Sequence, residues 1–215
     1  VTIFIGVPQV FSLLHKSICK KLEEISIPKK IIFMLASAFN VLTRKGFKIN
    51  CGKKLFSELH KTFGHKLKYM VSGGAKLDKK VAVDFYKWGF EVLEGYGLTE
   101  TSPVATFNPI KKPKIGSVGK PIPQVEIKIQ DPDAKGVGEV LIKGPNVMQG
   151  YYKQEEATNE VIKNGWFYSG DLGYFDNDGY LFLVGRKKEM IVLSSGKNIH
   201  PESIERQYSQ SPYIK

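Results

Sequence analysis

The chain has 215 residues, of which 42% are hydrophobic and 25% charged, and its formal net charge is +11. This length allows one or two domains with a buried core. No apolar run reaches the roughly 18 residues of a membrane-spanning helix, so we expect residues 31–42 to form a buried or interfacial helix. Two cysteines give neither a disulfide framework nor a metal-binding spacing, which favours a reducing cytoplasm.

The positive charge is concentrated at the start of the chain. Residues 1–68 contain 13 Lys and Arg against 3 Glu, a net +10, which leaves +1 for the other 147 residues. This basic, helix-rich part is either a solvated lysine face or a surface for peripheral contact with an anionic membrane. No nucleic-acid-binding motif is present, so we do not expect a nucleic acid partner. The four histidines are scattered and do not suggest a metal site.

The first half of the chain has an α/β pattern. Short apolar segments with Pro and Gly as breaks predict strands over residues 2–7, 66–71 and 90–93. Apolar positions at three-to-four spacing predict helices over 9–25 and 29–43, with a break around Ile27-Pro28, and further helices are expected over 52–63 and 77–88. The order strand, helix, strand over residues 66–93 predicts a parallel crossover.

After Asn108 the pattern changes to short strands. Residues 125–129 and 138–142 alternate, and residues 174–183 read as a hairpin whose turn contains Asp178-Gly179. A further strand is expected over residues 190–193, and Pro201 suits the first turn of a helix running through Glu205. We therefore expect a small β-barrel or sandwich at about residues 115–184.

Two glycine-bearing segments follow the predicted parallel strands: Ser72-Gly73-Gly74-Ala75 and Glu94-Gly95-Tyr96-Gly97. Ligands of open α/β sheets bind at the carboxyl ends of the strands, which is where both segments fall. Neither segment is a phosphate-binding P-loop or a dinucleotide fingerprint, because each lacks the required glycine spacing.

Residues 94–101, Glu-Gly-Tyr-Gly-Leu-Thr-Glu-Thr, combine the groups that a nucleotide site needs. Tyr96 offers a flat face to adenine, and the flanking glycines let the backbone approach closely. Thr99 can donate to a phosphate oxygen, and Glu100 is a hard oxygen ligand for Mg²⁺. The alternative is a strand-ending turn with a buried Tyr and a surface Glu.

Two later motifs contain further polar candidates, Tyr168-Ser169-Gly170-Asp171-Leu172 and Gly185-Arg186-Lys187-Lys188-Glu189. The Asp171 carboxylate can accept two hydrogen bonds from a ribose diol, each worth roughly 1.5–3 kcal/mol. Alternatively, it caps its own turn. Arg186 can bind oxygens with its forked guanidinium in a way that Lys cannot.

The three motifs, in this order, closely resemble those of the adenylate-forming superfamily. Within it, residues 7–11, the lysine-rich helical insert that follows, and residues 138–152 most resemble the long-chain fatty acid–CoA ligases. The resemblance implies an α/β fold: a parallel α/β subdomain, a small β-barrel subdomain and the start of an α+β C-terminal domain. The expected divisions are 1–112, 113–185 and 186–215.

The resemblance also implies site residues. Thr99, Glu100, Arg186 and Lys188 would be catalytic, with Glu100 as the metal ligand and Lys188 at the hinge between the large and small domains. Nucleotide or CoA binding would involve Gly73, Gly74, Ala75, Glu94, Gly95, Tyr96, Gly97, Thr99, Asp171, Arg186 and Gly196, the last lining the pantetheine channel. Lys76 stands where many relatives have Pro. Alternatively, residues 187–189 are only a charged linker, and Gly196 is only a residue of a tight turn.

The implied reaction has two steps: ATP and Mg²⁺ activate a fatty acid as an acyl-adenylate, and CoA then takes the acyl group and releases AMP. Two alternatives stay open, another carboxylate-activating adenylate-forming enzyme and a non-catalytic basic membrane-binding module. We expect a cytoplasmic protein, with membrane association at the inner face as a further hypothesis.

The family's upstream phosphate loop and its downstream catalytic lysine are missing from the sequence, which does not begin with Met. We therefore expect a fragment that cannot adenylate a fatty acid by itself.

Overall fold

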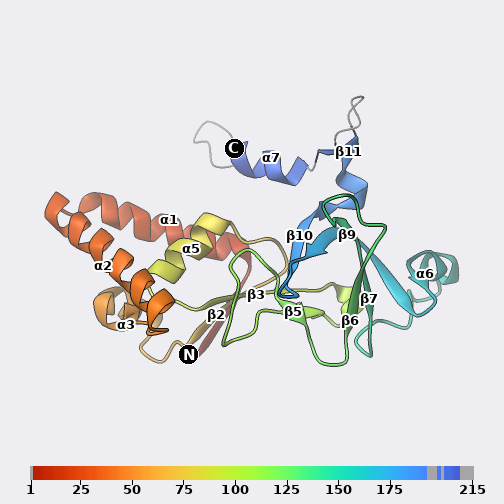
Figure 1. Cartoon of the computed structure of the whole chain (residues 1–215), viewed down its shortest axis with the longest axis horizontal. Helices are drawn as coiled ribbons and strands as arrows, with labels where there is room; N and C mark the ends of the chain where they lie inside the picture. Colours follow the sequence, from red (N-terminus) through yellow and green to blue (C-terminus); the bar gives the residue numbers. More distant parts are fainter. Residues whose placement is uncertain (1, 193–197, 200, 209–215) are drawn as a thin grey trace. The chain divides into compact units, whose positions relative to one another are not determined.

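The structure, a computed structural model, describes residues 2–192, 198–199 and 201–208 and divides into two compact units (Figure 1). Unit 1 comprises residues 1–96 and 107–116, and unit 2 comprises residues 97–106 and 117–215. The short strand β4 (Thr106–Phe107) spans the boundary between them.

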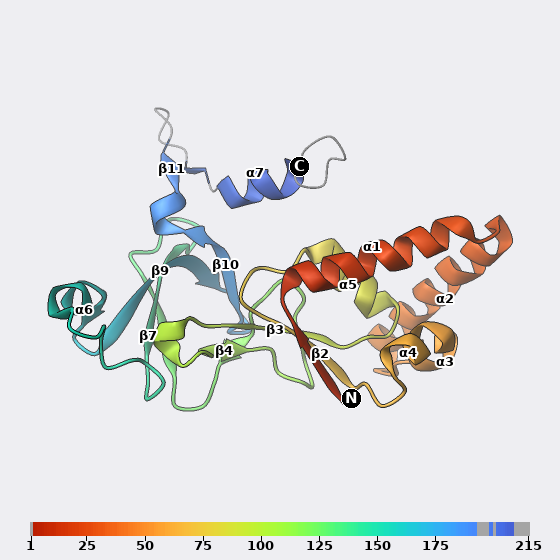
Figure 2. The same ribbon diagram turned by 180° about the vertical axis from the view of Figure 1, so that it is seen from behind.

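Unit 1 is built on three parallel strands in the order β1-β2-β3: β1 (Ile3–Gly6), β2 (Tyr69–Ser72) and β3 (Val92–Tyr96). Its helices are α1 (Pro8–Glu24), α2 (Ile27–Gly46), α3 (Gly52–Leu55), α4 (Ser57–Phe63) and α5 (Lys79–Lys87). Helix α5 connects β2 to β3, which confirms the predicted parallel crossover. Both views show α1 and α5 on one side of these strands (Figure 2).

Several boundaries differ from the prediction. The break between the first two helices falls at residues 25–26, because Pro28 fits within the first turn of α2 instead of ending a helix. The helix expected over residues 52–63 is two helices, interrupted at Phe56, whose non-helical backbone lets its ring enter the core with 5% exposure. Strand β3 begins two residues later than expected, so Glu94 and Tyr96 belong to the strand itself.

The inward side of helix α2 combines apolar residues that pack against the core, Phe33 and Ala36, with polar residues that bind backbone groups. Asn40, fully buried, donates from Nδ2 to the Lys87 carbonyl at 3.0 Å and accepts from the Cys51 amide at 2.9 Å. Arg44 donates to the Tyr86 carbonyl at 3.1 Å. The outward face is apolar, with 52–69% exposure at Ile31, Ile32, Met34, Leu35, Phe39 and Leu42. Residues 31–42 are therefore helical, as predicted, but they are not buried, and the interfacial alternative stays a prediction. Within the described part of the chain, no helix is long and apolar enough to span a membrane.

Unit 2 is centred on an antiparallel sheet in the order β10-β9-β7-β6. Its strands are β6 (Glu126–Gln130), β7 (Gly138–Lys143), β9 (Trp166–Phe175) and β10 (Leu181–Arg186), with β8 (Ile162–Lys163) paired to β9 and the short β5 (Lys120–Pro121) outside this sheet. The central strand β7 is buried from Gly138 to Ile142 and forms the core of the unit.

The predicted β-hairpin of unit 2 is confirmed. Strands β9 and β10 flank a turn in which the Asp176 amide donates to the Tyr180 carbonyl at 3.0 Å and Gly179 has φ of +75°. Helix α6 (Glu155–Val161) was not predicted, because its seven residues have no apolar periodicity. The turn η2 (Lys187–Glu189), strands β11 (Ile191–Val192) and β12 (Asn198–Ile199) and helix α7 (Pro201–Tyr208) follow, and Pro201 begins its helix as expected.

Candidate functional site

The two glycine-bearing segments of unit 1 lie next to each other. Strands β2 and β3 pair in register Ser72 to Glu94, so both segments leave the sheet at the same edge. A Cβ atom placed on Gly73 would lie 3.8 Å from the Gly95 carbonyl oxygen, which is van der Waals contact. The predicted position of both segments at the carboxyl ends of the parallel strands is thus confirmed, and their backbones lie next to each other there.

Glu94 is a buried carboxyl group, with 5% of the residue exposed. Burial raises its pKa to about 7, although hydrogen bonds from the Gly116 and Leu77 amides and the charge of Lys76 act in the opposite direction. The Gly116 amide donates to Glu94 Oε1 at 3.2 Å. Glu94 therefore holds the neighbouring loop backbone in place. These hydrogen bonds account for the buried carboxyl group without any contact to a ligand.

Ser72, at the start of the first glycine-bearing segment, is 1% exposed. Its hydroxyl oxygen is buried and has no hydrogen-bonding partner within residues 2–192, 198–199 and 201–208. An unsatisfied buried hydroxyl costs about 1–3 kcal/mol, so such a group at a loop marks a place where a further hydrogen-bonding group fits. Tyr96, the last residue of the neighbouring strand β3, is 9% exposed.

The segment after Tyr96 is a tightly folded loop in unit 2 that carries the turn η1 (Thr99–Thr101). The Thr101 hydroxyl accepts from the Leu98 amide at 2.9 Å and donates to the Leu98 carbonyl at 3.0 Å. A Cβ on Gly97 would lie 1.8 Å from the Pro103 carbonyl oxygen, so only glycine fits there. These contacts stabilise the loop that carries Thr99 and Glu100.

Glu100 is held at both its main chain and its side chain. The Tyr151 hydroxyl donates to Glu100 Oε1 at 2.9 Å, and the Met148 amide donates to the Glu100 carbonyl at 2.8 Å. Burial, and then the Glu100 hydrogen bond and charge, raise the pKa of Tyr151, which keeps this phenol a donor. An oriented carboxylate of this kind suits Mg²⁺, which takes one or two protein carboxylates and completes its shell with waters and phosphates.

Asp171 and Arg186 form the second cluster of predicted site residues. They are directly opposite each other on β9 and β10, and Arg186 Nε donates to Asp171 Oδ1 at 3.1 Å. The Asp171 side chain is 11% exposed, whereas that of Arg186 is 56% exposed. Ser169 supports the arrangement because its hydroxyl accepts from the Asp171 amide at 3.1 Å and donates to the Val140 carbonyl at 2.7 Å.

Glu139 and Lys187 form an ion pair beside this cluster that the sequence did not indicate. Lys187 Nζ lies 2.7 Å from Glu139 Oε2, and Glu139 Oε1 accepts from the Gly170 amide at 3.2 Å. The Glu139 carboxylate thus joins the loop before Asp171 to the turn η2. Lys188, the predicted hinge residue, is exposed in that turn, and the predicted Gly196 lies outside the described residues.

Sequence reasoning also missed Tyr151, although it lies in the 138–152 stretch. Nothing in that stretch connects it to Glu100, which is 51 residues earlier. The structure therefore brings together residues 72–75 with 94–95 in unit 1, and Glu100 with Tyr151 and Asp171 with Arg186 in unit 2.

Other kinds of active site have less support. Among the described residues, no group of three or more His, Cys, Asp or Glu side chains could hold a metal ion. Cys19 Sγ lies 3.7 Å from His15 Nε2, and that nitrogen is 2.9 Å from Asp84 Oδ2. Burial and the charge of Asp84 raise the pKa of Cys19, the opposite of what an activated thiol nucleophile needs.

The fold is that of the adenylate-forming enzymes. It is similar to the solved structure of O-succinylbenzoate coenzyme A synthetase from Bacillus subtilis in complex with ATP and magnesium ion. The TM-score is 0.63 and the identity 31%, over 76% of this chain and 36% of that one. The AMP-binding enzyme family matches residues 1–152. The chain belongs to this family.

Two curated relatives show the range of similarity. A long-chain-fatty-acid–CoA ligase of Mycobacterium bovis is 40% identical over 160 residues, covering 74% of this chain and 26% of that protein. A 2-succinylbenzoate–CoA ligase of Bacillus mycoides is 33% identical over 214 residues, covering 94% of this chain and 44% of that protein. The chain therefore spans less than half the length of either relative.

Proposed function

We propose that the full-length protein is a long-chain fatty acid–CoA ligase that uses ATP and Mg²⁺. The 40% identity to a long-chain-fatty-acid–CoA ligase supports the substrate class. The main support for the reaction is the hydrogen bond from Tyr151 that orients the Glu100 carboxylate. Glu100 lies in a loop whose backbone leaves room only for glycine at position 97. Such a carboxylate suits the metal ion that accompanies ATP.

In the proposed first step, a fatty acid carboxylate oxygen attacks the α-phosphorus of ATP, and pyrophosphate leaves. In the second step, the CoA thiolate attacks the acyl carbonyl carbon, and AMP leaves as the carbon–oxygen bond breaks. Enzymes of this kind act mainly by positioning the reactants and stabilising charge on phosphate oxygens. Mg²⁺, when bound, would neutralise that charge.

We assign roles to residues of this chain on chemical grounds. The backbone of residues 73–75 and 94–97, with Tyr96, would bind adenine, and Thr99 would donate to a phosphate oxygen. Asp171 would accept from the ribose hydroxyls, and Arg186, already oriented by Asp171, would bind ribose or phosphate oxygens. Lys188 would serve as the hinge and Gly196 as part of the pantetheine channel, within the three-part division proposed from the sequence.

A different carboxylate substrate is the main competing proposal. The 2-succinylbenzoate–CoA ligase relative aligns with more of the chain, although at lower identity. We would assay AMP release that depends on CoA, using the full-length protein and straight-chain acids from acetate to oleate, with 2-succinylbenzoate in parallel. Release that peaks with the long acids supports the proposal, whereas release with 2-succinylbenzoate alone contradicts it.

A specific observation also favours contact with an anionic membrane. The outward apolar residues of α2 lie in a stretch without charge, residues 31–43, with Lys29 and Lys30 before it and the exposed Lys45 shortly after it. Apolar faces bounded by lysines are typical of helices that lie in a membrane interface. We propose this contact at the cytoplasmic leaflet. Sedimentation with phosphatidylserine vesicles tests it, and binding that is unchanged by Leu35→Glu contradicts it.

A further inference from the structure

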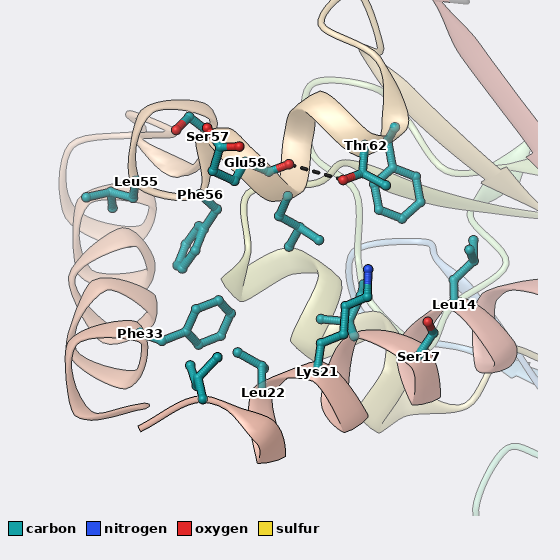
Figure 3. A pocket seen from close by; sticks show the side chains of 14 residues that line it. Leu14, Ser17, Lys21, Leu22, Phe33, Leu55, Phe56, Ser57, Glu58 and Thr62 are labelled. Atoms are coloured by element: carbon teal, nitrogen blue, oxygen red, sulfur yellow. Dashed lines mark hydrogen bonds between the residues drawn. The ribbon is translucent and has the colours of Figure 1, made fainter. Parts of the chain in front are cut away.

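Helices α1, α2, α3 and α4 of unit 1 enclose an apolar groove of about 460 Å³ (Figure 3). This volume falls within the range of roughly 300–1,000 Å³ that is usual for small-molecule sites. All residues that line the groove come before residue 64, so they are separate in sequence from both glycine-bearing segments and from the Asp171 cluster.

The floor of the groove is hydrophobic and is part of the unit's core. Phe56 is 5% exposed, and its ring centroid lies 4.8 Å from that of Phe33. The other floor residues, Ile18, Leu22, Leu59 and Phe63, pack against the same core. An apolar groove of this kind does not hold ordered water well, because it offers few hydrogen-bonding partners.

The polar groups lie at the rim. Thr62 donates to the Glu58 carbonyl at 3.2 Å, and the Glu58 carboxylate is paired with Lys61 at 2.5 Å, so both are already engaged. Lys21 reaches from α1 toward α4 across the groove (Figure 3). It has no hydrogen bond or ion pair with any residue that the structure describes. The rim therefore presents one uncompensated positive charge.

We propose that this groove binds one free fatty acid, with its aliphatic chain on the hydrophobic floor and its carboxylate at Lys21. The net charge of +10 over residues 1–68 attracts an anionic ligand to this part of the molecule. The site is non-catalytic and additional to the one where acyl activation takes place. That the ligand is a fatty acid rests on the proposed function. That the ligand has one aliphatic chain and an anionic end rests on the groove alone.

Oleate binding to the full-length protein without nucleotide tests the proposal by isothermal titration calorimetry. We expect two oleate molecules per chain. Lys21→Glu should weaken one of the two sites about tenfold or more, because it places like charges together. Ser17→Trp should abolish the same site, because an indole at this exposed lining position fills the groove. Lys20→Glu, an exposed neighbour that does not line the groove, should leave both sites unchanged.

Methyl oleate, which has no charge, should bind the groove equally well in the parent protein and in Lys21→Glu. A single oleate site that Ser17→Trp leaves unchanged would overturn the proposal, because the groove of the parent protein would then bind no oleate. Two full sites in Ser17→Trp would also overturn it. AMP release from long acids is measured on the same variants. Oleate binding that Ser17→Trp abolishes, in a parent protein that releases no AMP from any long acid, contradicts the proposed function and leaves this inference standing.

Discussion

Arg186 donates from Nε to the Asp171 carboxylate across the β9–β10 pair, at 3.1 Å. The Asp171 side chain is 11% exposed and that of Arg186 is 56% exposed, so a mostly buried carboxylate orients a mostly exposed arginine. The pair therefore offers acceptor oxygens and forked donors next to each other, which is what a ribose and its neighbouring phosphate require.

Asp171→Asn should lower ATP affinity by about tenfold to a hundredfold, because charge-assisted hydrogen bonds are worth roughly 1.5–3 kcal/mol. Equilibrium binding of ATP to the full-length protein measures this loss. Asp178→Asn, on the exposed hairpin turn, is the matched control and should bind like the parent protein. Equal affinities in all three proteins would remove Asp171 from the nucleotide site.

Glu100→Gln should raise the Mg²⁺ concentration needed for half-maximal AMP release, because an amide is a weaker ligand than a carboxylate. Tyr151→Phe should have a smaller effect in the same direction, since it removes the hydrogen bond that orients Glu100. A Mg²⁺ titration of the full-length protein gives both values. Glu126→Gln changes an exposed carboxylate of the same unit and should leave the titration unchanged.

Gly97→Ala should destabilise the protein by about 2 kcal/mol, because the added methyl overlaps the Pro103 carbonyl and the loop must shift. Thermal unfolding of the full-length variant tests this. Gly46→Ala is the control, since nothing lies within 4 Å of its added carbon and alanine favours the helix. A melting temperature equal to that of the parent would show that the loop adapts without cost.

Glu94 makes stability depend on pH. Its pKa is raised from 4.5 to about 7 in the folded state, so the unfolded chain loses its proton at lower pH than the folded chain. Stability should therefore fall as pH rises from 4.5 to about 7, by roughly 3 kcal/mol, and stay level above that range.

Glu94→Gln should remove this part of the pH dependence and be more stable than the parent at pH 8. Urea unfolding at pH 5 and pH 8 gives the comparison, with the exposed Glu24→Gln as control. If the parent and Glu94→Gln show the same difference between the two pH values, the carboxyl group is not the cause.

The sequence predicted the edge of the sheet that carries the glycine segments, because the ends of parallel strands coincide. Gly73 and Gly95 are adjacent for that reason. The sequence also predicted Asp171 and Arg186 as candidate site residues. It did not predict that they lie opposite each other, because this depends on the register of the hairpin and on a bulge between Leu183 and Gly185.

Other features depend on tertiary contacts that no local pattern reports. Apolar spacing predicted α2 as a helix, but it did not predict that Asn40 and Arg44 lie on the inward side and donate to carbonyl groups at the end of α5. Tyr151 meets Glu100 across 51 residues, and Lys187 meets Glu139 across 48. Partners this far apart in sequence are set by the packing of strands and loops, and one sequence alone does not define it.

The most direct test is to incubate the full-length protein with oleate, ATP and Mg²⁺ in the absence of CoA and to identify the nucleotide products by mass spectrometry. We expect oleoyl-adenylate and an equal amount of pyrophosphate, with both strongly reduced in Glu100→Gln. Formation of ADP and phosphate, or no change in ATP with any carboxylate, would contradict this expectation.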